Sequence, residues 1–205
     1  RGNIGVQVQH VDQSSSANYY DSSKPAGSNV IPYEAGKTYT DFLPSLNLAF
    51  SLVNDQTLRV ALAQQVARPR VDQLRASFEF GVNTATGRPG GGGGNPLLDP
   101  WRANAFDISY EKYFDTKAYV AAAYFYKDLK TYIYTQTQEY DFSEFVDDYV
   151  PPPGTQPAQD IGDYTAPANG EGGMLQGLEL TASLPFNLRW EALDGFGTVA
   201  SARFT

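Results

Sequence analysis

The stretch Phe42-Leu43-Pro44-Ser45-Leu46-Asn47-Leu48-Ala49-Phe50-Ser51-Leu52, followed after a short break by Thr57-Leu58-Arg59-Val60-Ala61-Leu62-Ala63, decides the fold. Large apolar side chains occupy every second position, and mostly small or polar side chains stand between them. Successive side chains of a strand point to opposite faces. The alternation therefore predicts two antiparallel strands with one apolar and one polar face, joined through the short polar connection Asn54-Asp55-Gln56.

The same period of two recurs along the chain, and no long segment shows the helical period of 3.6. This pattern predicts an all-β protein of roughly seven strands. We place them at residues 2–12, 38–53, 57–68, 105–114, 118–135, 174–184 and from 195 to the end.

The predicted connections alternate in length. Short ones lie at Asn54–Gln56, at Asp115–Lys117 and around residues 187–194, and long ones at residues 13–37, 69–104 and 136–173. Short turns on one side and long loops on the other are typical of outer-membrane β-barrels. The long connections are rich in Ser, Gly and Pro, and we expect the run Gly90–Gly94 to be a flexible loop. A phosphate-binding loop would need a following Gly-Lys-Ser/Thr, and Asn95-Pro96 follows here.

The amino-acid composition narrows the class of protein further. The 205 residues carry a formal net charge of -8, which argues against a nucleic-acid partner, and no cysteine is available for disulfides or thiolate metal sites. The hydrophobic fraction is 41%, yet the mean hydropathy is only -0.39, as expected where every second strand residue meets lipid. A soluble half-buried sheet also alternates. The small residues on the polar face and the loop layout favour an antiparallel up-and-down transmembrane β-barrel segment with long extracellular loops.

No pattern points to catalysis. His10 is the single histidine and is interpreted as an ordinary strand or interface residue rather than a catalytic base. Asp147, Asp148, Asp160 and Asp163 lack the spacing of a calcium loop and are interpreted as a solvated acidic loop. Nothing fixes a carboxylate pair for glycoside hydrolysis. We expect no enzyme activity, no metal and no cofactor.

Aromatic residues in the long connections are the candidate ligand-binding groups, because Tyr and Trp rings pack on sugar rings or hydrophobic chelates and offer a polar tip. The alternatives are a self-packed loop or an aromatic girdle at the membrane interface. The strongest candidates are Trp101, Tyr149, Tyr140, Phe80 and Tyr20. The remaining members of the group are Tyr19, Tyr33, Phe78, Phe142, Phe145 and Tyr164.

Three polar residues are expected to face the barrel lumen or its outer rim, namely Arg59, Gln65 and Arg68. They could guide a polar substrate. Pairing with carboxylates of the lumen or of a plug domain is the preferred interpretation.

Several motifs, in order along the chain, resemble the barrel domain of TonB-dependent outer-membrane receptors. They are Gly2–Val6, Leu43–Leu48 with Leu58–Ala61, Ala67–Pro69, Gly94–Pro100, Asp107–Phe114 with Ala123–Leu129, and Gln176–Leu180. The nearest similarity is to the branch common in xanthomonads, caulobacters and sphingomonads, some of whose members resemble oligosaccharide importers.

The resemblance implies a barrel of about 22 strands with a plug inside, of which residues 1–205 would supply about a third. No plug, TonB-contacting segment or C-terminal aromatic strand is recognised among these residues, and the patterns at both ends predict a piece of a longer chain. The implied function is TonB-dependent active import of a scarce nutrient, an oligosaccharide or similar, across the bacterial outer membrane. Implied partners are outer-membrane lipid, the small ligand, and TonB with its inner-membrane energising complex, reached through the plug. A siderophore or iron-chelate receptor, a porin-like or surface-binding barrel, and a soluble β-domain remain alternatives.

Overall fold

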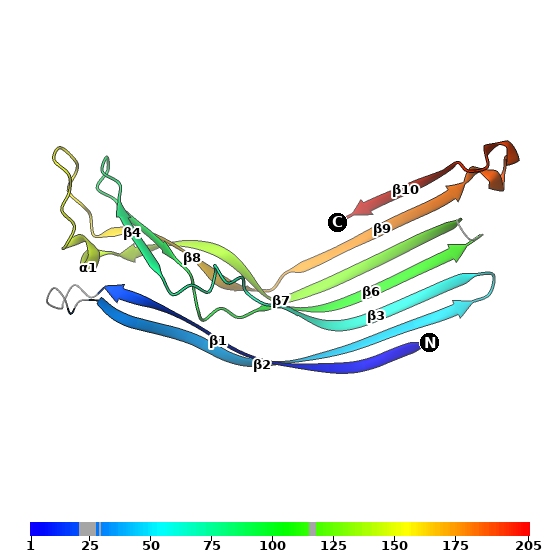
Figure 1. Ribbon diagram of the computed structural model, residues 1–205, viewed down its shortest axis with the longest axis horizontal. Helices are drawn as coiled ribbons and strands as arrows, with labels where there is room; N and C mark the ends of the chain where they lie inside the picture. The colour runs from blue at the N-terminus through cyan, green and yellow to red at the C-terminus, as the bar shows by residue number, and fades with distance from the viewer. Residues whose placement is uncertain (21–27, 29, 115–117) are drawn as a thin grey trace.

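The computed structural model describes residues 1–20, 28, 30–114 and 118–205, with the side chains of Tyr19, Tyr20 and Leu188 outside that description. A single sheet runs in the order β1-β2-β3-β6-β7-β8-β5-β4, and β9 and β10 extend it beside residues 119–128 of β7 (Figure 1). We call the half of the sheet that contains β9 and β10 the lower part, on the right in Figure 1, and the half that carries α1 the upper part, on the left. The strands are β1 (Gly2–Tyr20), β2 (Val30–Leu52), β3 (Gln56–Ala67), β4 (Phe78–Val82), β5 (Pro89–Gly93), β6 (Trp101–Tyr113), β7 (Tyr119–Asp141), β8 (Ile161–Glu171), β9 (Met174–Pro185) and β10 (Gly197–Phe204). One short helix, α1 (Ser143–Val146), and two 3-10 turns, η1 (Phe186–Leu188) and η2 (Glu191–Leu193), complete the elements.

All seven predicted strands are present, as β1, β2, β3, β6, β7, β9 and β10, and neighbouring strands pair antiparallel. The predicted turn between β2 and β3 is confirmed. Asn54 and Asp55 adopt the left-handed conformation, with φ of 57° and 54°. Asn and Asp tolerate this region better than most residues, which explains their place in the turn.

The predicted bounds of the long connections, residues 13–37, 69–104 and 136–173, were wrong, because strands occupy much of them. β1 continues to Tyr20, β2 begins at Val30 and β7 continues to Asp141, while β8 fills part of residues 136–173. In these outer extensions apolar and polar side chains no longer alternate regularly, as in Ser14–Ser16 of β1 and Thr135–Glu139 of β7. The pattern that identifies a strand in the sequence therefore disappears although the backbone pairing continues. The predicted loop residues Asp21–Pro25 and the turn Asp115–Lys117 lie outside the described residues.

The prediction of a flexible loop at Gly90–Gly94 was also wrong. Residues 89–93 form β5, which pairs antiparallel with β4 and in parallel with the edge of β8. The glycines permit close packing, because a Cβ at Gly91 would lie 2.6 Å from the Glu79 carbonyl oxygen and 2.9 Å from the Phe142 ring. Close approach, rather than flexibility, is what the glycine at this position provides.

β7 organises the molecule, because β8 pairs with its upper half and β9 with its lower half. The pairs Thr131↔Glu171 and Asp128↔Met174 belong to one uninterrupted register, so β8 and β9 are one long strand broken at Gly172, which has a φ of 75°. At the same level β6 shifts its register against β7 between Arg102 and Ala103. Bulges and positive-φ glycines bend sheets, and the sheet bends at this level (Figure 1).

The even-numbered face of the lower strands is apolar and uncovered. Ile4, Phe42 and Leu62 are 82%, 62% and 46% exposed. Leu46, Leu48, Val60 and Ile108 are half-buried, as expected where only neighbours in the same sheet cover them. In the described strands the buried hydrophobic residues are Ala105 and Ile133, and Ala105 lies on the opposite, odd-numbered face. The apolar face thus has the exposure expected of a surface that meets lipid.

Within the described part of the chain, no helix has the length and apolar character needed to cross a membrane.

Replacing Leu62 with Arg should impair insertion. Leu62 pairs with Leu46 and Phe106 in the middle of the apolar face, and a cation at the bilayer midplane costs about 2–4 kcal/mol. The yield of folded receptor in liposomes, read from its heat-dependent electrophoretic mobility, measures the effect. Asn47→Arg on the polar face is the matched control and should assemble normally. Equal assembly of both variants would contradict the assignment of the lipid face.

Candidate ligand-binding site

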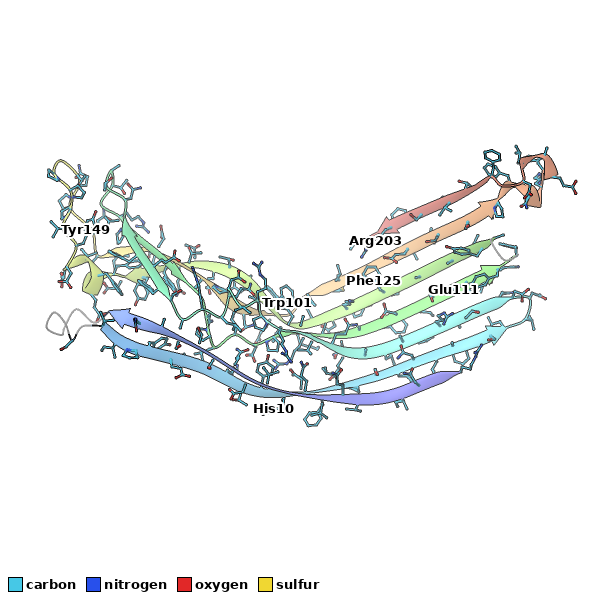
Figure 2. All side chains as sticks on the ribbon, in the orientation of Figure 1. His10, Trp101, Glu111, Phe125, Tyr149 and Arg203 are labelled. Carbon is cyan, nitrogen blue, oxygen red and sulfur yellow. The ribbon has the colours of Figure 1, made fainter. Side chains whose placement is uncertain are left out.

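A cavity of about 970 Å³, here called the outer cavity, lies between the upper ends of β1 and β2 and the upper part of β7 and β8. Segments preceding β4 and following β5, together with the region after α1, complete its wall. Its aromatic lining consists of Tyr33, Phe78, Phe80, Tyr140, Phe145, Tyr149 and Tyr164. Its amide lining consists of Asn18, Asn95, Gln136 and Gln138. Figure 2 shows Tyr149 at the far end of this upper region.

The rings pack on one another, which holds them in place. Phe78 stacks on Phe145 with ring centroids 4.8 Å apart and on Tyr164 at 5.5 Å. Phe80 stacks on Phe145 at 5.5 Å, and its edge meets Tyr149 at 6.4 Å. Aromatic pairs at such distances contribute beyond their buried area. The cluster is therefore both self-packed and cavity-lining.

A short turn, closed by the side chain of Asp141, precedes α1. The Asp141 carboxylate accepts a hydrogen bond of 3.0 Å from the Ser143 backbone N–H, and this hydrogen bond lowers the pKa of Asp141. Phe142 beside it is fully buried, with its ring 4.9 Å from that of Tyr140. Phe142 thus supports the cavity wall from behind, whereas Tyr140 lines the cavity itself.

Basic groups near the outer cavity are already neutralised. Arg88 donates two hydrogen bonds to Asp163, of 2.7 Å and 3.1 Å, and these lower the pKa of Asp163. Arg75 lies 2.8 Å from Glu79. Among the described residues, the lining contains no Lys, Arg or His, and Asp148 is its charged member. A surface of rings and amides suits a neutral ligand with hydroxyl groups.

The acidic loop does not gather into a metal site within the described residues, where no three His, Asp or Glu side chains are close enough to hold an ion.

The segment Asn95–Pro100, here called the partition segment, forms the floor of the outer cavity. Asn95, Pro96 and Leu97 line the cavity, whereas Leu98 and Pro100 are fully buried. The Gln13 amide donates to the carbonyl oxygens of Pro96 and Leu98, at 3.0 Å and 2.8 Å. The Thr131 hydroxyl donates to the Pro100 carbonyl oxygen at 2.6 Å. The segment is thus tied to β1 and β7, which come from distant parts of the chain.

Asp99 is the charged centre of the partition segment. Its carboxylate lies 2.6 Å from Lys37 Nζ and 3.3 Å from Arg102 Nη1. Its backbone N–H donates to Asn169 Oδ1 at 2.8 Å, and Asn169 Nδ2 donates to its carbonyl oxygen at 2.9 Å. Burial alone would raise the pKa of Asp99, but the Lys37 and Arg102 hydrogen bonds outweigh it and hold the pKa below its ordinary value.

Trp101 follows the partition segment and lines a second cavity of about 820 Å³, here called the inner cavity, on the polar face of the sheet. Gln65 lines it as well. Figure 2 shows Trp101 at the bend of the sheet, away from Tyr149. The ligand-binding residues predicted from sequence are therefore divided. Phe80, Tyr140 and Tyr149 come together in the outer cavity, and Trp101 stands apart from them.

The remaining predicted residues have other surroundings. Arg59 Nε lies 3.2 Å from Glu111 Oε1 in the lower sheet, and the Arg68 guanidinium faces the amide of Gln9. His10 Nδ1 lies 2.9 Å from Thr40 Oγ1 on exposed strand surface. The side chain of Tyr20 lies outside the described residues. A ligand-binding role for the predicted residues stays a prediction.

Sequence reasoning missed Gln136 and Gln138, which were assigned to a loop. They share one face of β7 with Tyr140, and all three line the outer cavity. The alternation Gln136-Gln138-Tyr140 was visible in the sequence, but without apolar residues it gave no strand signal.

A family model described as the β-barrel of TonB-dependent receptor-like proteins matches residues 1–205. The chain belongs to the TonB-dependent receptor β-barrel family. Membership places it in the outer membrane of a Gram-negative bacterium. No curated protein sequence matches the chain.

Solved structures of receptor barrels share the fold of this TonB-dependent receptor segment. A mutant ferric enterobactin receptor of Pseudomonas aeruginosa superposes with a TM-score of 0.59 at 20% identity, covering 80% of this chain and 22% of that one. A siderophore receptor of the same organism gives 0.55 at 12% identity, covering 98% and 34%. The Serratia marcescens hemophore receptor gives 0.53 at 15% identity, covering 89% and 28%. The chain thus spans about a fifth to a third of these receptors, and the likeness shows the fold.

Replacing Asp99 with Asn should loosen the partition segment in the assembled receptor. Loss of the carboxylate removes its ion pairs to Lys37 and Arg102. We expect tryptic cleavage after Arg70, Arg75 or Arg88 to become roughly tenfold faster at neutral pH, equivalent to about 1.4 kcal/mol. Asp72→Asn, which breaks only the exposed pair with Arg70, is the control and should leave cleavage after Arg75 and Arg88 near the native rate.

The same site predicts a pH dependence. Because the pKa of Asp99 is lowered, its ionised form stabilises the folded segment above the ordinary carboxyl pKa of about 4, and this stabilisation disappears as the pH falls through the lowered value. Hydrogen exchange of residues 95–100 should therefore differ between the native and Asp99→Asn receptors at neutral pH and converge in acid. A constant difference at all pH values would show that Asp99 does not act through its charge.

Proposed function

We propose that the receptor containing this chain imports a neutral oligosaccharide, or a nutrient of similar chemistry, across the outer membrane in a TonB-dependent manner. The outer cavity captures the ligand on the extracellular side. The energy comes from the inner-membrane complex through TonB, and the barrel wall formed by this chain makes and breaks no covalent bond. Family membership supports the transport mode, and the cavity supports the choice of ligand.

The lining of the outer cavity is the observation that carries the proposal. Flat rings of Phe80, Tyr140 and Tyr149 can cover the apolar faces of pyranose rings. The amides of Gln136 and Gln138 project from the same face of β7 and each offer donors and an acceptor for hydroxyl groups. Specificity in such sites comes from a few polar groups placed on an apolar wall.

An iron chelate is the competing ligand class. The similar solved structures include receptors described as binding ferric enterobactin, a siderophore, or a hemophore with heme. A negatively charged chelate would need cations to offset its desolvation. Arg88 and Arg75 near the outer cavity are each engaged by a carboxylate. Because both arginines are already paired with carboxylates, they leave no free cation for an anionic chelate, and this favours the neutral ligand.

Uptake by cells that express the complete receptor tests the assignment. Radiolabelled gluco-, xylo- and chito-hexaose form one set of probes, and a ferric tris-catecholate forms the other. We expect saturable uptake of at least one hexaose, abolished by a protonophore and by loss of TonB. Uptake of the ferric chelate alone would replace the oligosaccharide assignment, and uptake insensitive to the protonophore would indicate a passive pore.

Replacing Tyr149 or Phe80 with Ala should weaken binding of the transported hexaose about tenfold, since one stacking platform contributes about 1.4 kcal/mol. Isothermal titration calorimetry on the purified receptor measures the change in Kd. Phe196→Ala is the matched control, because Phe196 is 67% exposed and belongs to the segment between η2 and β10. The start of β10 lies at the opposite end of the sheet from α1 (Figure 1). Unchanged affinity in both cavity variants, beside a native receptor that binds, would move the site elsewhere.

A further inference from the structure

Lys112 interrupts the apolar, even-numbered face of the lower strands. It is paired in register with Gln56 of β3 on one side and with Val120 of β7 on the other. An ionisable group on a membrane-spanning segment is costly and marks a functional position. Within the described part of the chain the ammonium group of Lys112 makes no ion pair, and it lies 5.3 Å from the centroid of the Phe114 ring. Lys112 is therefore a positive charge on the lipid face to which these residues supply no anion.

The periplasmic end of the barrel wall is close to Lys112. Lys112 is the last but one residue of β6, and the next residue, Tyr113, donates its backbone N–H to the Asp55 carbonyl oxygen in the short turn between β2 and β3. Short turns face the periplasm in outer-membrane barrels. Figure 2 shows Glu111 near this end of β6. Because a lysine side chain can extend from apolar surface to the membrane interface, the ammonium group can reach the headgroups of the periplasmic leaflet.

A hollow of about 510 Å³, here called the lipid-face recess, opens on the same face beside Lys112. Small side chains on the neighbouring strands β7, β9 and β10 form its floor. Two rows of paired residues cross it, one continuing from Lys112 and one from Tyr110. The first row is Val120, Ala182 and Ala200, and the second is Ala122, Leu180 and Ala202.

Bulky side chains surround the lipid-face recess. Tyr110 borders it on the side of β6. The next row toward the upper part contains Tyr124, Leu178 and Phe204, and the next row toward the periplasmic end contains Leu184. An apolar hollow that stays empty forfeits the dispersion contacts of the atoms that line it. A flexible hydrocarbon chain fills such a hollow, and hydrocarbon is the medium that this face meets.

The polar groups beside the lipid-face recess fit a phosphate. Gln56 Oε1 accepts a hydrogen bond of 2.6 Å from the Tyr110 hydroxyl, so the amide N–H groups are the donors that Gln56 offers next to Lys112. A phosphodiester is negatively charged and accepts hydrogen bonds through its oxygens, and hydrogen bonds between two charged groups are the strong ones. An apolar recess and a cationic donor pair thus lie side by side, as acyl chain and phosphate do in one lipid molecule.

We propose that the lipid-face recess and Lys112 form a binding site for one glycerophospholipid of the periplasmic leaflet. An acyl chain lies in the recess, and the phosphate is bound by Lys112 and Gln56. The positive charge and the apolar floor together select a lipid as the occupant, because a second protein surface would bring polar backbone against the alanines. The site holds a lipid at one position, unlike the rest of the apolar face, and it does not depend on the ligand that the receptor transports.

Native mass spectrometry of the complete receptor, purified in detergent, tests the proposal by titration with three lipids. Dioleoylphosphatidylglycerol and dioleoylphosphatidylethanolamine carry the phosphate, and dioleoylglycerol lacks it. We expect one phospholipid of either kind to bind more tightly than all later ones. Dioleoylglycerol should bind about tenfold more weakly, since it lacks the charge-assisted hydrogen bonds.

Two variants separate the two halves of the site. Lys112→Gln should weaken the tight phospholipid site about tenfold by removing the charge. Ala182→Phe fills the recess and should abolish tight binding while keeping the charge. Lys130→Gln, which removes a lysine that is paired with Asp128, and Val60→Phe, which enlarges a lipid-facing residue outside the recess, are the matched controls. Both controls should bind one phospholipid as the native receptor does.

Three results would overturn the site. Equal phospholipid affinity in the native, Lys112→Gln and Ala182→Phe receptors would mean that lipid contacts this face without a preferred position. Equal affinity for dioleoylglycerol would remove the role of the phosphate. A native receptor that binds no phospholipid tightly but forms dimers through this face would assign the recess to a second copy. Ala182→Phe gives the answer if Lys112→Gln does not assemble, because it leaves the charged residue in place.

Discussion

The structure depends on backbone hydrogen bonding between strands of a single sheet. In hydrocarbon, each peptide group must find its partner within the protein, and the registers of β1, β2, β3, β6, β7 and β9 run without interruption through the apolar band. Once the backbone hydrogen bonds are made, the side chains need only be apolar on one face of the sheet and polar or small on the other. Leu46, Leu62 and Phe106 share one face, and Asn47, Ala61 and Asp107 share the other.

The same hydrogen-bonded strands continue beyond the lipid-facing region and hold the candidate site there. β7 passes from the lipid-facing region into the upper region without a break, and only its neighbours change, at Gly172 and at the Arg102/Ala103 shift. The partition segment packs at that bend and joins β1, β2, β7 and β8 through Gln13, Lys37, Thr131 and Asn169. The bend thereby separates a cavity of stacked rings from a recess on the polar face.

The lower strands and their hairpins were predictable from the sequence. In them Leu and Val alternate with Ser, Asn and Ala, which matches an apolar face toward lipid and a polar or small face on the other side of the sheet. The upper strands were not predictable, since Ser14–Ser16 and Gln136–Gln138 are polar on both faces and show no alternation that would mark a strand, although they pair in register. Gly91 was misread because its sequence signal is the same for flexibility and for close packing. Self-packing of the aromatic group was one of the alternatives that the sequence left open, but the separation of Trp101 from Phe80, Tyr140 and Tyr149 depends on the partition segment. The anchors of that segment lie 31 to 85 residues away in the sequence.

Accessibility along β3 tests the central claim most directly. Because the chain has no cysteine, single cysteines can be placed at each position from 57 to 67 of the complete receptor, provided its other cysteines are removed. They are then labelled with nitroxide spin labels and measured in liposomes. Collision with oxygen should be highest at the even positions 58, 60, 62 and 66, and collision with a water-soluble nickel chelate at the odd positions. Low collision rates for both reagents at the even positions would mean that protein, not lipid, covers that face, and would contradict the account.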